Sequence, residues 1–532
     1  MHRLIDIALC LAKNGKSLRG HNENTNSVSK GLFLEMVDLL KKYDSLLSEH
    51  LENGPKNASY ISNRIQNDIL LSIQNVMKRN ISSRVKNTMV SIIADETSDC
   101  SHYEQLSVCV RYFNKKENRP VEHFVGVKRL LSVNAQSVYD SLTEAINEIG
   151  IDWKNVIAVC FDGAATMAGS CNGSCFVEAS PVRHAILERV SKDINLKLRS
   201  LKTLSIIRWA CRSEAIEAVK NNYSALLLCL EEISDKTNLS EVRAKAKGLI
   251  FQMKTFDFIF SMHILSPVLI MIQKVSASLQ SPNLDLLSAV SLVKSLREHL
   301  SKLRSDDNNF IVIYNEVLSV CQKNLISIPE VKKRKFTRKI DDNSTLYTVD
   351  SKIEEMRYFT SYPMLDEMIQ GIDERFSQET LNLIASMGKM LKLQTDDADI
   401  KILSEAFNLK NIHTEIKLLI NIPEIESICG SSNINISKWL DWLVDSGRSE
   451  IFSDFYKSIK LFVTIPVTSC SCERAFSKLT IVKSKLRSVM TQKRLDALML
   501  IFIEQHISTE IDIDDVIEEF KVLIPGKRRL EL

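Results

Sequence analysis

Two aspartates end apolar runs in a way that suits metal-dependent phosphoryl transfer. Asp95 follows the apolar residues of MVSIIADETSD, and Asp162 follows those of NVIAVCFDG. Short runs rich in β-branched residues predict buried strands. If these strands lie side by side in a mixed sheet, both carboxylates emerge at one edge. Two hard oxygen ligands there can hold Mg²⁺ or Mn²⁺, and two such ions about 3.5–4 Å apart can clamp the oxygens of a phosphoryl transfer.

A plainer interpretation of each aspartate is a cap on the turn that follows a strand. Small residues after Asp162 (GAA) favour the metal site, because they allow a substrate or backbone to approach closely. A third carboxylate, Glu473, begins the apolar helical stripe of CERAFSKLTIV. Taken alone, Glu473 is better explained as a residue of a helix's first turn or as a partner of Arg474.

The elements that must position these residues follow a regular order. Three strand-like runs (89–99, 106–113 and 121–131) precede a helix over 137–150, and a buried strand over 155–163 follows. Residues 1–85 and most of 182–430 have apolar positions spaced three and four apart, which predicts helices. The sequence therefore predicts an α/β core combined with a large α-helical part.

Composition excludes several classes of protein. The 532 residues are 45% apolar and 25% charged, with a net charge of only +3, so neither disorder nor DNA binding follows from composition. The twelve cysteines lack the spacing of a disulfide framework or of a zinc finger, so no structural zinc is expected. No signal peptide begins the chain, and the apolar run 258–272 contains His263 and Pro267 and is too short for a membrane span. We expect a reduced, intracellular protein without a membrane segment or a small-molecule substrate.

Several motifs together resemble the hAT transposase superfamily, with zinc finger MYM-type protein 1-like members nearest in pattern. They are IIADETSD with EQLSVCVRYF, then CFDGAATMAG, then IIRWACR, and the long block IPVTSCSCERAFSKLTIVKSKLRSVMTQKRLDALML. The resemblance extends from about residue 15 to residue 506. It implies a ribonuclease-H-like mixed sheet core, interrupted by a large all-helical insertion and completed by C-terminal helices.

The resemblance also implies boundaries and a site. It divides the chain into a helical N-terminal region (1–85), the first part of the core (86–181), the insertion (182–434), a hAT dimerisation region that completes the core (435–510) and a tail (511–532). The catalytic and metal-binding triad falls on Asp95, Asp162 and Glu473, with Mg²⁺ or Mn²⁺ as cofactor if the protein is active. We expect these three carboxylates to converge, with Glu96 on the opposite face of its strand and Asp99 past the strand end.

Two further segments are candidates for nucleic-acid binding. Arg208 and Trp209 match the family's Arg-Trp element, where an aromatic ring could stack on an unpaired base. The alternative for Trp209 is a core position at a helix start. A basic run that includes Lys332, Lys333, Arg334 and Lys335 could contact phosphate or direct nuclear import, whereas a solvated loop is the plainer interpretation. DNA is the expected partner, and the nucleus the expected location.

The C-terminal block carries more apolar residues than one helix stripe requires, and ALMLIFI is apolar on nearly all sides. An uncovered remainder would mark an interface. We therefore expect a homodimer through Trp439, Phe476, Leu479, Leu495, Leu498 and Phe502. Burial against the helical insertion is the alternative.

Two departures from the family pattern bear on activity. The chain has no zinc-binding DNA-recognition module at its start, which suggests a fragment or a copy without its targeting finger. The family segment H-C-x-x-H-x-L-N-L is reduced here to INLKL. The sequence thus predicts a hAT-type transposase-like protein, decayed or domesticated, that cleaves and joins DNA if active. The alternative is a non-catalytic nuclear dimerising protein derived from a transposase.

Overall fold

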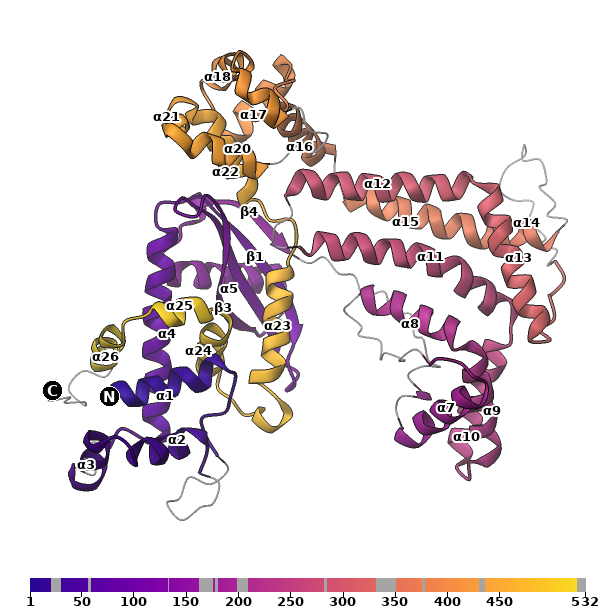
Figure 1. Ribbon diagram of the computed structural model, residues 1–532, viewed down its shortest axis with the longest axis horizontal. Coiled ribbons are helices and arrows are strands. Elements are labelled where there is room, and N and C mark those ends of the chain that lie inside the picture. Colours follow the sequence, from indigo (N-terminus) through magenta and orange to yellow (C-terminus); the bar gives the residue numbers. More distant parts are fainter. Residues whose placement is uncertain are drawn as a thin grey trace. The chain divides into compact units, whose positions relative to one another are not determined.

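A computed structural model describes residues 1–20, 30–55, 59–132, 134–161, 176–177, 180–198, 209–281, 285–331, 351–375, 378–429 and 436–523. The chain forms two compact units (Figure 1). The first combines Met1–Gly163 with Ala385–Leu532, and the second is Ala164–Ile384. Residues 385–434, grouped with the insertion from the sequence, thus lie in the first unit.

A four-stranded mixed sheet is the centre of the first unit. Its strands are β1 (Val90–Ser98), β2 (Glu104–Asn114), β3 (Arg119–Leu130) and β4 (Val156–Phe161), in the order β3-β2-β1-β4. β1 pairs antiparallel with β2 and parallel with β4. The predicted order of elements along the chain, three strands, a helix and a fourth strand, is confirmed, and the first and fourth strands do lie side by side.

Helices cover both faces of this sheet at β2, whereas β4, expected to be buried, has Val159 and Phe161 40% and 48% exposed. Every residue of β2 from Gln105 to Phe113 is buried, which a sheet with one solvated face would not allow. Helix α5 (Ala135–Glu148) lies on one face, because Glu144 accepts a hydrogen bond of 2.8 Å from Lys128, whose position in β3 is aligned with Leu106 and Glu96. Helix α23 (Cys470–Val482) packs on β1 and β2 from the opposite face (Figure 1).

The two ends of the chain meet beside the sheet. The N-terminal region forms α1 (His2–Lys13), α2 (Leu32–Lys41), α3 (Ser45–Asn53) and α4 (Asn63–Val85). The C-terminal part adds α24 (Gln492–Ile503), α25 (Gln505–Glu510) and α26 (Ile513–Val522). Helix α24 contacts α1, α4, α23 and β3, and α26 contacts α4, so that a single apolar core includes both ends.

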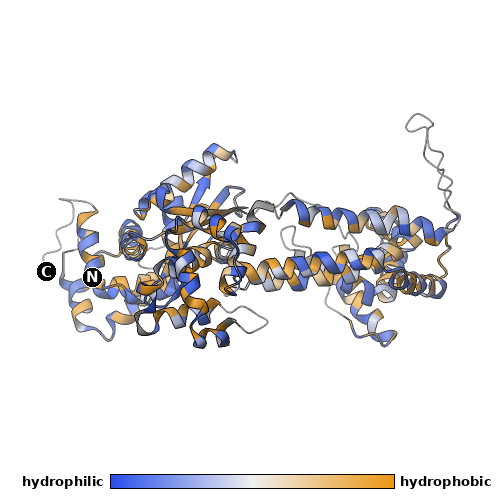
Figure 2. Cartoon of the chain, turned by 90° about the horizontal axis from the view of Figure 1, so that it is seen from above, coloured by the Kyte–Doolittle hydropathy of each residue, from blue (hydrophilic) through white to orange (hydrophobic). Residues whose placement is uncertain are grey.

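The remaining helices of the first unit precede α23 in sequence. They are α16 (Gln378–Leu391), which crosses the unit boundary, α17 (Asp397–Phe407), α18 (Ile412–Ile420), α19 (Glu426–Cys429), α20 (Ile436–Val444), α21 (Arg448–Ile451) and α22 (Ser453–Thr464). Helix α22 also contacts β2 and β3. Figure 2 shows hydrophobic and hydrophilic residues interleaved along the helices, as amphipathic helices require.

All the regular elements that the structure describes in the second unit are helices. Its helices are α7 (Pro181–Asp193), α8 (Trp209–Asn221), α9 (Tyr223–Lys236), α10 (Ser240–Met253), α11 (Phe256–Leu279), α12 (Leu286–Ser305), α13 (Asp307–Lys323), α14 (Lys352–Met356) and α15 (Tyr362–Arg375). Within the described residues, α11 is the one helix whose length and composition would allow a membrane span. Its Phe256 and Phe260 lie in the core of this unit, as in a central helix of a bundle.

Candidate functional site

Asp95 lies in β1 on the face of the sheet that α23 covers. Its position is aligned with Ser107 of β2, and Ile93, two residues earlier, is aligned with Cys109. Because strand side chains alternate, Ile93, Asp95, Ser107 and Cys109 share one face. Asp95 is half-buried, and its Oδ1 accepts a 2.8 Å hydrogen bond from the Glu96 backbone N–H.

The first turn of α23 is held against this face by Cys472. The Cys472 Sγ lies 3.4 Å from the Ile93 carbonyl oxygen, 3.5 Å from that of Ser107 and 3.8 Å from the Cys109 Sγ. The Cys472 side chain is completely buried. A small thiol fits here because the helix backbone must approach the strands closely.

Glu473 follows Cys472 directly and is half-buried in the first turn of α23. The anchoring of Cys472 therefore brings Glu473 to the same face of the sheet as Asp95, although 378 positions of sequence separate the two residues. Glu96 lies on the opposite face, and burial and the charge of Glu104 raise its pKa.

Asp162 lies outside the described residues. Strand β4 ends at Phe161, which is aligned with Ala94 in the parallel pair. Ala94 and Phe161 are thus an aligned pair, and Asp95 and Asp162 are the next residues in sequence. Among the described residues alone, without Asp162, no group of three His, Cys, Asp or Glu side chains is close enough to hold a metal ion.

The other end of α23 is fixed by a buried ion pair that the sequence did not reveal. Lys483, which follows the helix, donates a 2.5 Å hydrogen bond to Asp99, which follows β1. Asp99 also accepts hydrogen bonds from Gln105 Nε2 (2.9 Å) and from the backbone N–H groups of Ser101 (2.7 Å) and Tyr103 (3.2 Å). Burial alone would raise the pKa of Asp99. The hydrogen bond from Lys483 and the three other hydrogen bonds outweigh burial, so that the pKa of Asp99 is lowered.

Ser107 adds a buried hydroxyl beside Asp95. It is only 1% exposed, and its Oγ has no hydrogen-bond partner among the described residues. Such a group costs about 1–3 kcal/mol if it stays unpaired. Ser107 is therefore a spare hydrogen-bond donor on the face of the sheet that bears Asp95.

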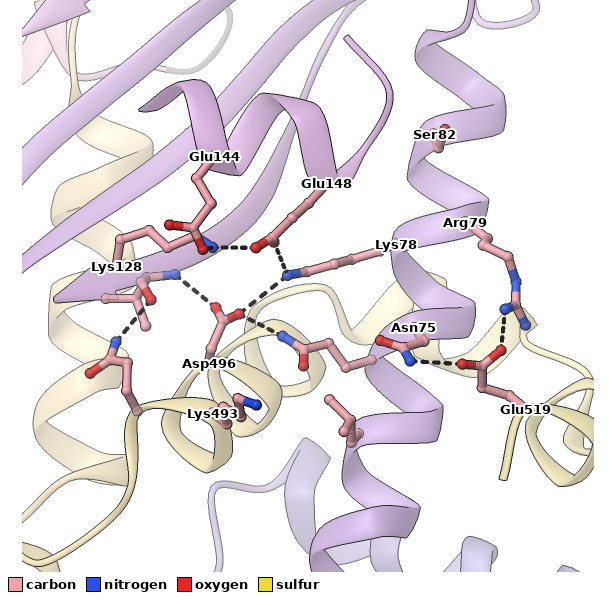
Figure 3. Close-up of a pocket in the computed structure, with 14 residues that line it drawn as sticks. Asn75, Lys78, Arg79, Ser82, Lys128, Glu144, Glu148, Lys493, Asp496 and Glu519 are labelled. Atoms are coloured by element: carbon pink, nitrogen blue, oxygen red, sulfur yellow. Dashed lines mark hydrogen bonds and ion pairs between the residues drawn. The ribbon is translucent and has the colours of Figure 1, made fainter. Parts of the chain in front are cut away.

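A polar pocket of about 560 Å³ lies between α4, α5, α24, α26 and β3 (Figure 3). Asp496 of α24 accepts hydrogen bonds from Gln74 (2.7 Å), Lys78 (3.2 Å) and the backbone N–H of Val127 (2.8 Å). Lys78 also pairs with Glu148 at 2.6 Å. The positive and negative charges in this pocket neutralise one another, so the pocket does not present free charge. Its hydrogen bonds tie α24 to the edge strand β3.

Glu504, directly after α24, extends the same edge contact. It accepts a 2.7 Å hydrogen bond from the Phe124 backbone N–H and lies 2.9 Å from His123 Nδ1. Asp496 and Glu504 together satisfy two outward N–H groups of β3. This pairing holds the C-terminal block on the sheet and so supports the position of α23.

Of the candidate nucleic-acid residues, Trp209 alone lies in the part of the chain that the structure describes. Arg208, Lys332, Lys333, Arg334 and Lys335 lie outside the described residues. Trp209 is the first residue of α8 in the second unit.

The six expected dimer contacts divide into two groups. Trp439, Leu479, Leu495 and Leu498 are at most 3% exposed within the single chain. Their apolar surface is covered by the chain's own elements: α24 and α23 pack on each other and on the sheet, and the Trp439 ring packs on Phe455 of α22. This corrects the inference that these four need a second subunit to be buried. Phe476 and Phe502 are half-buried and pack against the same core.

Comparison with known proteins gives matches at both ends of the chain. Residues 1–173 match the model of the ZMYM1/FAM200 RNase-like domain, and residues 422–507 match the hAT family C-terminal dimerisation region. The human protein named "52 kDa repressor of the inhibitor of the protein kinase" is 21% identical over 588 aligned residues, which cover 96% of this chain and 74% of the relative. Its mouse counterpart is 21% identical over 592 residues, with 96% and 75% covered.

Proposed function

We propose that this chain, a transposase-derived protein of the hAT type, is built on a ribonuclease-H-like core and acts on DNA phosphodiesters. The mixed sheet with β1 parallel to β4 supports such a core. So does the second unit, which interrupts the first unit in sequence. Fold alone does not define a reaction, so the proposal depends on the carboxylates.

The observation that carries the proposal is the contact of Cys472 with Ile93 and Ser107. It puts Glu473 on the face of the sheet that bears Asp95. Asp162 directly follows Phe161, which is aligned with Ala94, just as Asp95 directly follows Ala94. We propose that these three carboxylates form one site.

The donor set fits Mg²⁺ or Mn²⁺, since aspartate and glutamate supply hard, anionic oxygens. When bound, such ions would activate a water molecule or a DNA 3′-hydroxyl and would stabilise charge on the phosphodiester. The protein's own contribution is positional. Asp95 is held by the Glu96 N–H, and α23 is held at both ends by Cys472 and Lys483.

A second candidate function is a non-catalytic, dimerising nuclear protein that keeps the fold. The relatives that match nearly the whole chain are named as repressors, which favours this candidate. The shortened segment before Trp209 favours it as well. The hAT dimerisation region supports a homodimer under either proposal.

A cleavage and strand-transfer assay on labelled duplex DNA with Mn²⁺ separates the two. We expect activity in the wild type and its loss, by at least about 100-fold, in Asp95→Asn and Asp162→Asn. Glu96→Gln is the matched control, because it removes a neighbouring carboxylate from the opposite face of β1. Equal background in the wild type and Asp162→Asn would leave the non-catalytic function.

A further inference from the structure

The end of β2 and helix α22 are fixed beside each other in the first unit. Nε and Nη2 of Arg111 donate to the Val463 carbonyl oxygen at 3.0 and 2.8 Å. The rings of Phe113 and Tyr456 meet edge to face, with centroids 6.2 Å apart. These contacts join the end of β2 to one side of α22.

Three lysines come together where these elements meet. Lys115 is exposed at the end of β2, and Lys457 and Lys460 are half-buried on α22. The Lys460 Nζ lies 4.1 Å from the centroid of the Tyr456 ring, and Lys457 Nζ donates to the Asn408 carbonyl oxygen at 2.9 Å. Burial lowers the pKa of Lys460, and the charges of Lys115 and Lys457 lower it further.

This lysine cluster (Lys115, Lys457 and Lys460) differs from three lysines that form buried or half-buried ion pairs in the same unit. Lys78, Lys128 and Lys483 each have a carboxylate within 3.2 Å. Across the described residues, the cluster has no carboxylate within 4.0 Å of any of its three ammonium groups. Three cations that repel one another, with no counter-ion among the residues that the structure describes, form a site that an anion would stabilise.

We propose that the lysine cluster binds the phosphodiester backbone of DNA. The proposal rests on the proposed function in one respect, because it takes DNA to be the substrate. Lysine ammonium groups act as point charges toward phosphate oxygens. The aromatic pair beneath them is part of the packing, since Phe113 is only 7% exposed and Tyr456 is half-buried. The contact is therefore electrostatic and independent of base sequence.

The test is equilibrium binding of a fluorescein-labelled duplex to the full chain in EDTA, followed by anisotropy over a series of salt concentrations. EDTA removes divalent metal, so the measurement does not depend on catalysis. Each lost phosphate contact makes the slope of log K against log salt shallower by about 0.9. For the variant Lys115→Gln/Lys457→Gln/Lys460→Gln we expect a slope shallower by about 2–3 and an affinity at least about 10-fold weaker at 100 mM salt.

The matched control is Lys154→Gln/Lys401→Gln/Lys521→Gln, which removes the same charge. These lysines pair with carboxylates of Asp152, Glu405 and Glu518, respectively. We expect the control to keep the wild-type slope. Equal losses in both triple variants would overturn the proposal, because they would reflect net charge alone.

Two additional variants separate a binding effect from misfolding. Lys115→Gln/Lys460→Gln leaves the Lys457 hydrogen bond in place and should reduce the slope by about 2. Lys460→Arg keeps the charge and should bind as the wild type does.

A wild type that binds no duplex at low salt, or binds poly-glutamate as tightly as DNA, would overturn the DNA assignment. If the triple variant binds DNA more weakly than the wild type but neither the wild type nor any variant cleaves DNA, the catalytic function is refuted and the binding proposal stands.

Discussion

Lys483 donates a 2.5 Å hydrogen bond to Asp99, and the two side chains are 2% and 1% exposed. One residue follows α23 and the other follows β1, so the pair fixes the end of the helix to the end of the strand. Cys472 fixes the beginning of the same helix. Glu473 thus lies on a helix that is anchored at both ends.

Removal of one partner of this pair should be costly. Lys483→Met leaves the Asp99 carboxylate buried without its cation, and we expect a loss of about 3–5 kcal/mol in the free energy of unfolding. Urea denaturation followed by circular dichroism measures it. The double variant Lys483→Met/Asp99→Asn should recover a large part of the loss, since no uncompensated charge remains. Equal stability of the two variants would contradict the argument.

The same pair predicts a pH dependence. The pKa of Asp99 is lower in the folded protein than its ordinary value of 3.8, so protonation of Asp99 costs more in the folded state than in the unfolded state. Its stabilising contribution is complete above the unfolded pKa and is lost as pH falls through the folded pKa. The wild type should lose more stability below about pH 4 than Lys483→Met/Asp99→Asn does. Parallel pH curves for the two proteins would rule out this contribution.

Gly126 is required by the close approach of α24 to β3. A Cβ atom at this position would lie 2.7 Å from Asp496 Oδ1, which accepts the Val127 N–H. Gly126→Ala should therefore destabilise the protein by about 1–3 kcal/mol, because Asp496 must move away from that N–H. In the Asp496→Ala background the same substitution should cost less by at least about 1 kcal/mol. Additive effects in this double-mutant cycle would show that Asp496 is not the obstacle.

The strands of the sheet could be predicted from the sequence because their signal is local. Runs such as VSIIAD and LSVCVRYF combine β-branched residues with turn residues at their ends, and β1 and β2 form there. The position of Glu473 in a first helical turn was also predictable from its local pattern.

The contacts that position the site could not be predicted in this way. Asp99 and Lys483 are separated by 384 positions, and no periodic pattern links them. Periodicity also indicates that Leu495 and Leu498 are buried but cannot identify the surface that buries them. In the structure that surface belongs to the same chain, since α4 and β3 pack on α24.

The buried thiols of the site should resist alkylation. The hydrogen bond that Cys109 shares with Cys472 and the burial of its thiol both raise the pKa of Cys109, so its reactive thiolate does not form near neutral pH. Iodoacetamide at pH 8 should label the exposed Cys10 and Cys100 and leave Cys109 and Cys472 unmodified in the native protein. Peptide mass spectrometry reads out each site, and denatured protein is the control. Rapid native labelling of Cys472 would mean that α23 detaches readily from the sheet.

A homodimer should depend on apolar residues that the single chain leaves exposed. Phe502 is a poor probe of dimerisation, because its ring lies within 3.2 Å of the position that a Cβ at Gly15 would take. Within the matched dimerisation region, Val489 is 95% exposed and Ile451 is 65% exposed. If a second copy covers either one, Val489→Glu or Ile451→Glu should weaken the dimer at least about 10-fold by burying a charge without a partner.

Light scattering over a concentration series measures this change. Leu131→Glu is the matched control, since Leu131 is 89% exposed but lies outside the dimerisation region. We expect the control to keep the wild-type mass and the melting temperature of all three variants to stay close to that of the wild type. A wild type that is monomeric at micromolar concentrations would refute the homodimer. A dimer that survives both substitutions would place the interface on other residues, because exposed surface charge costs little unless it is buried on association.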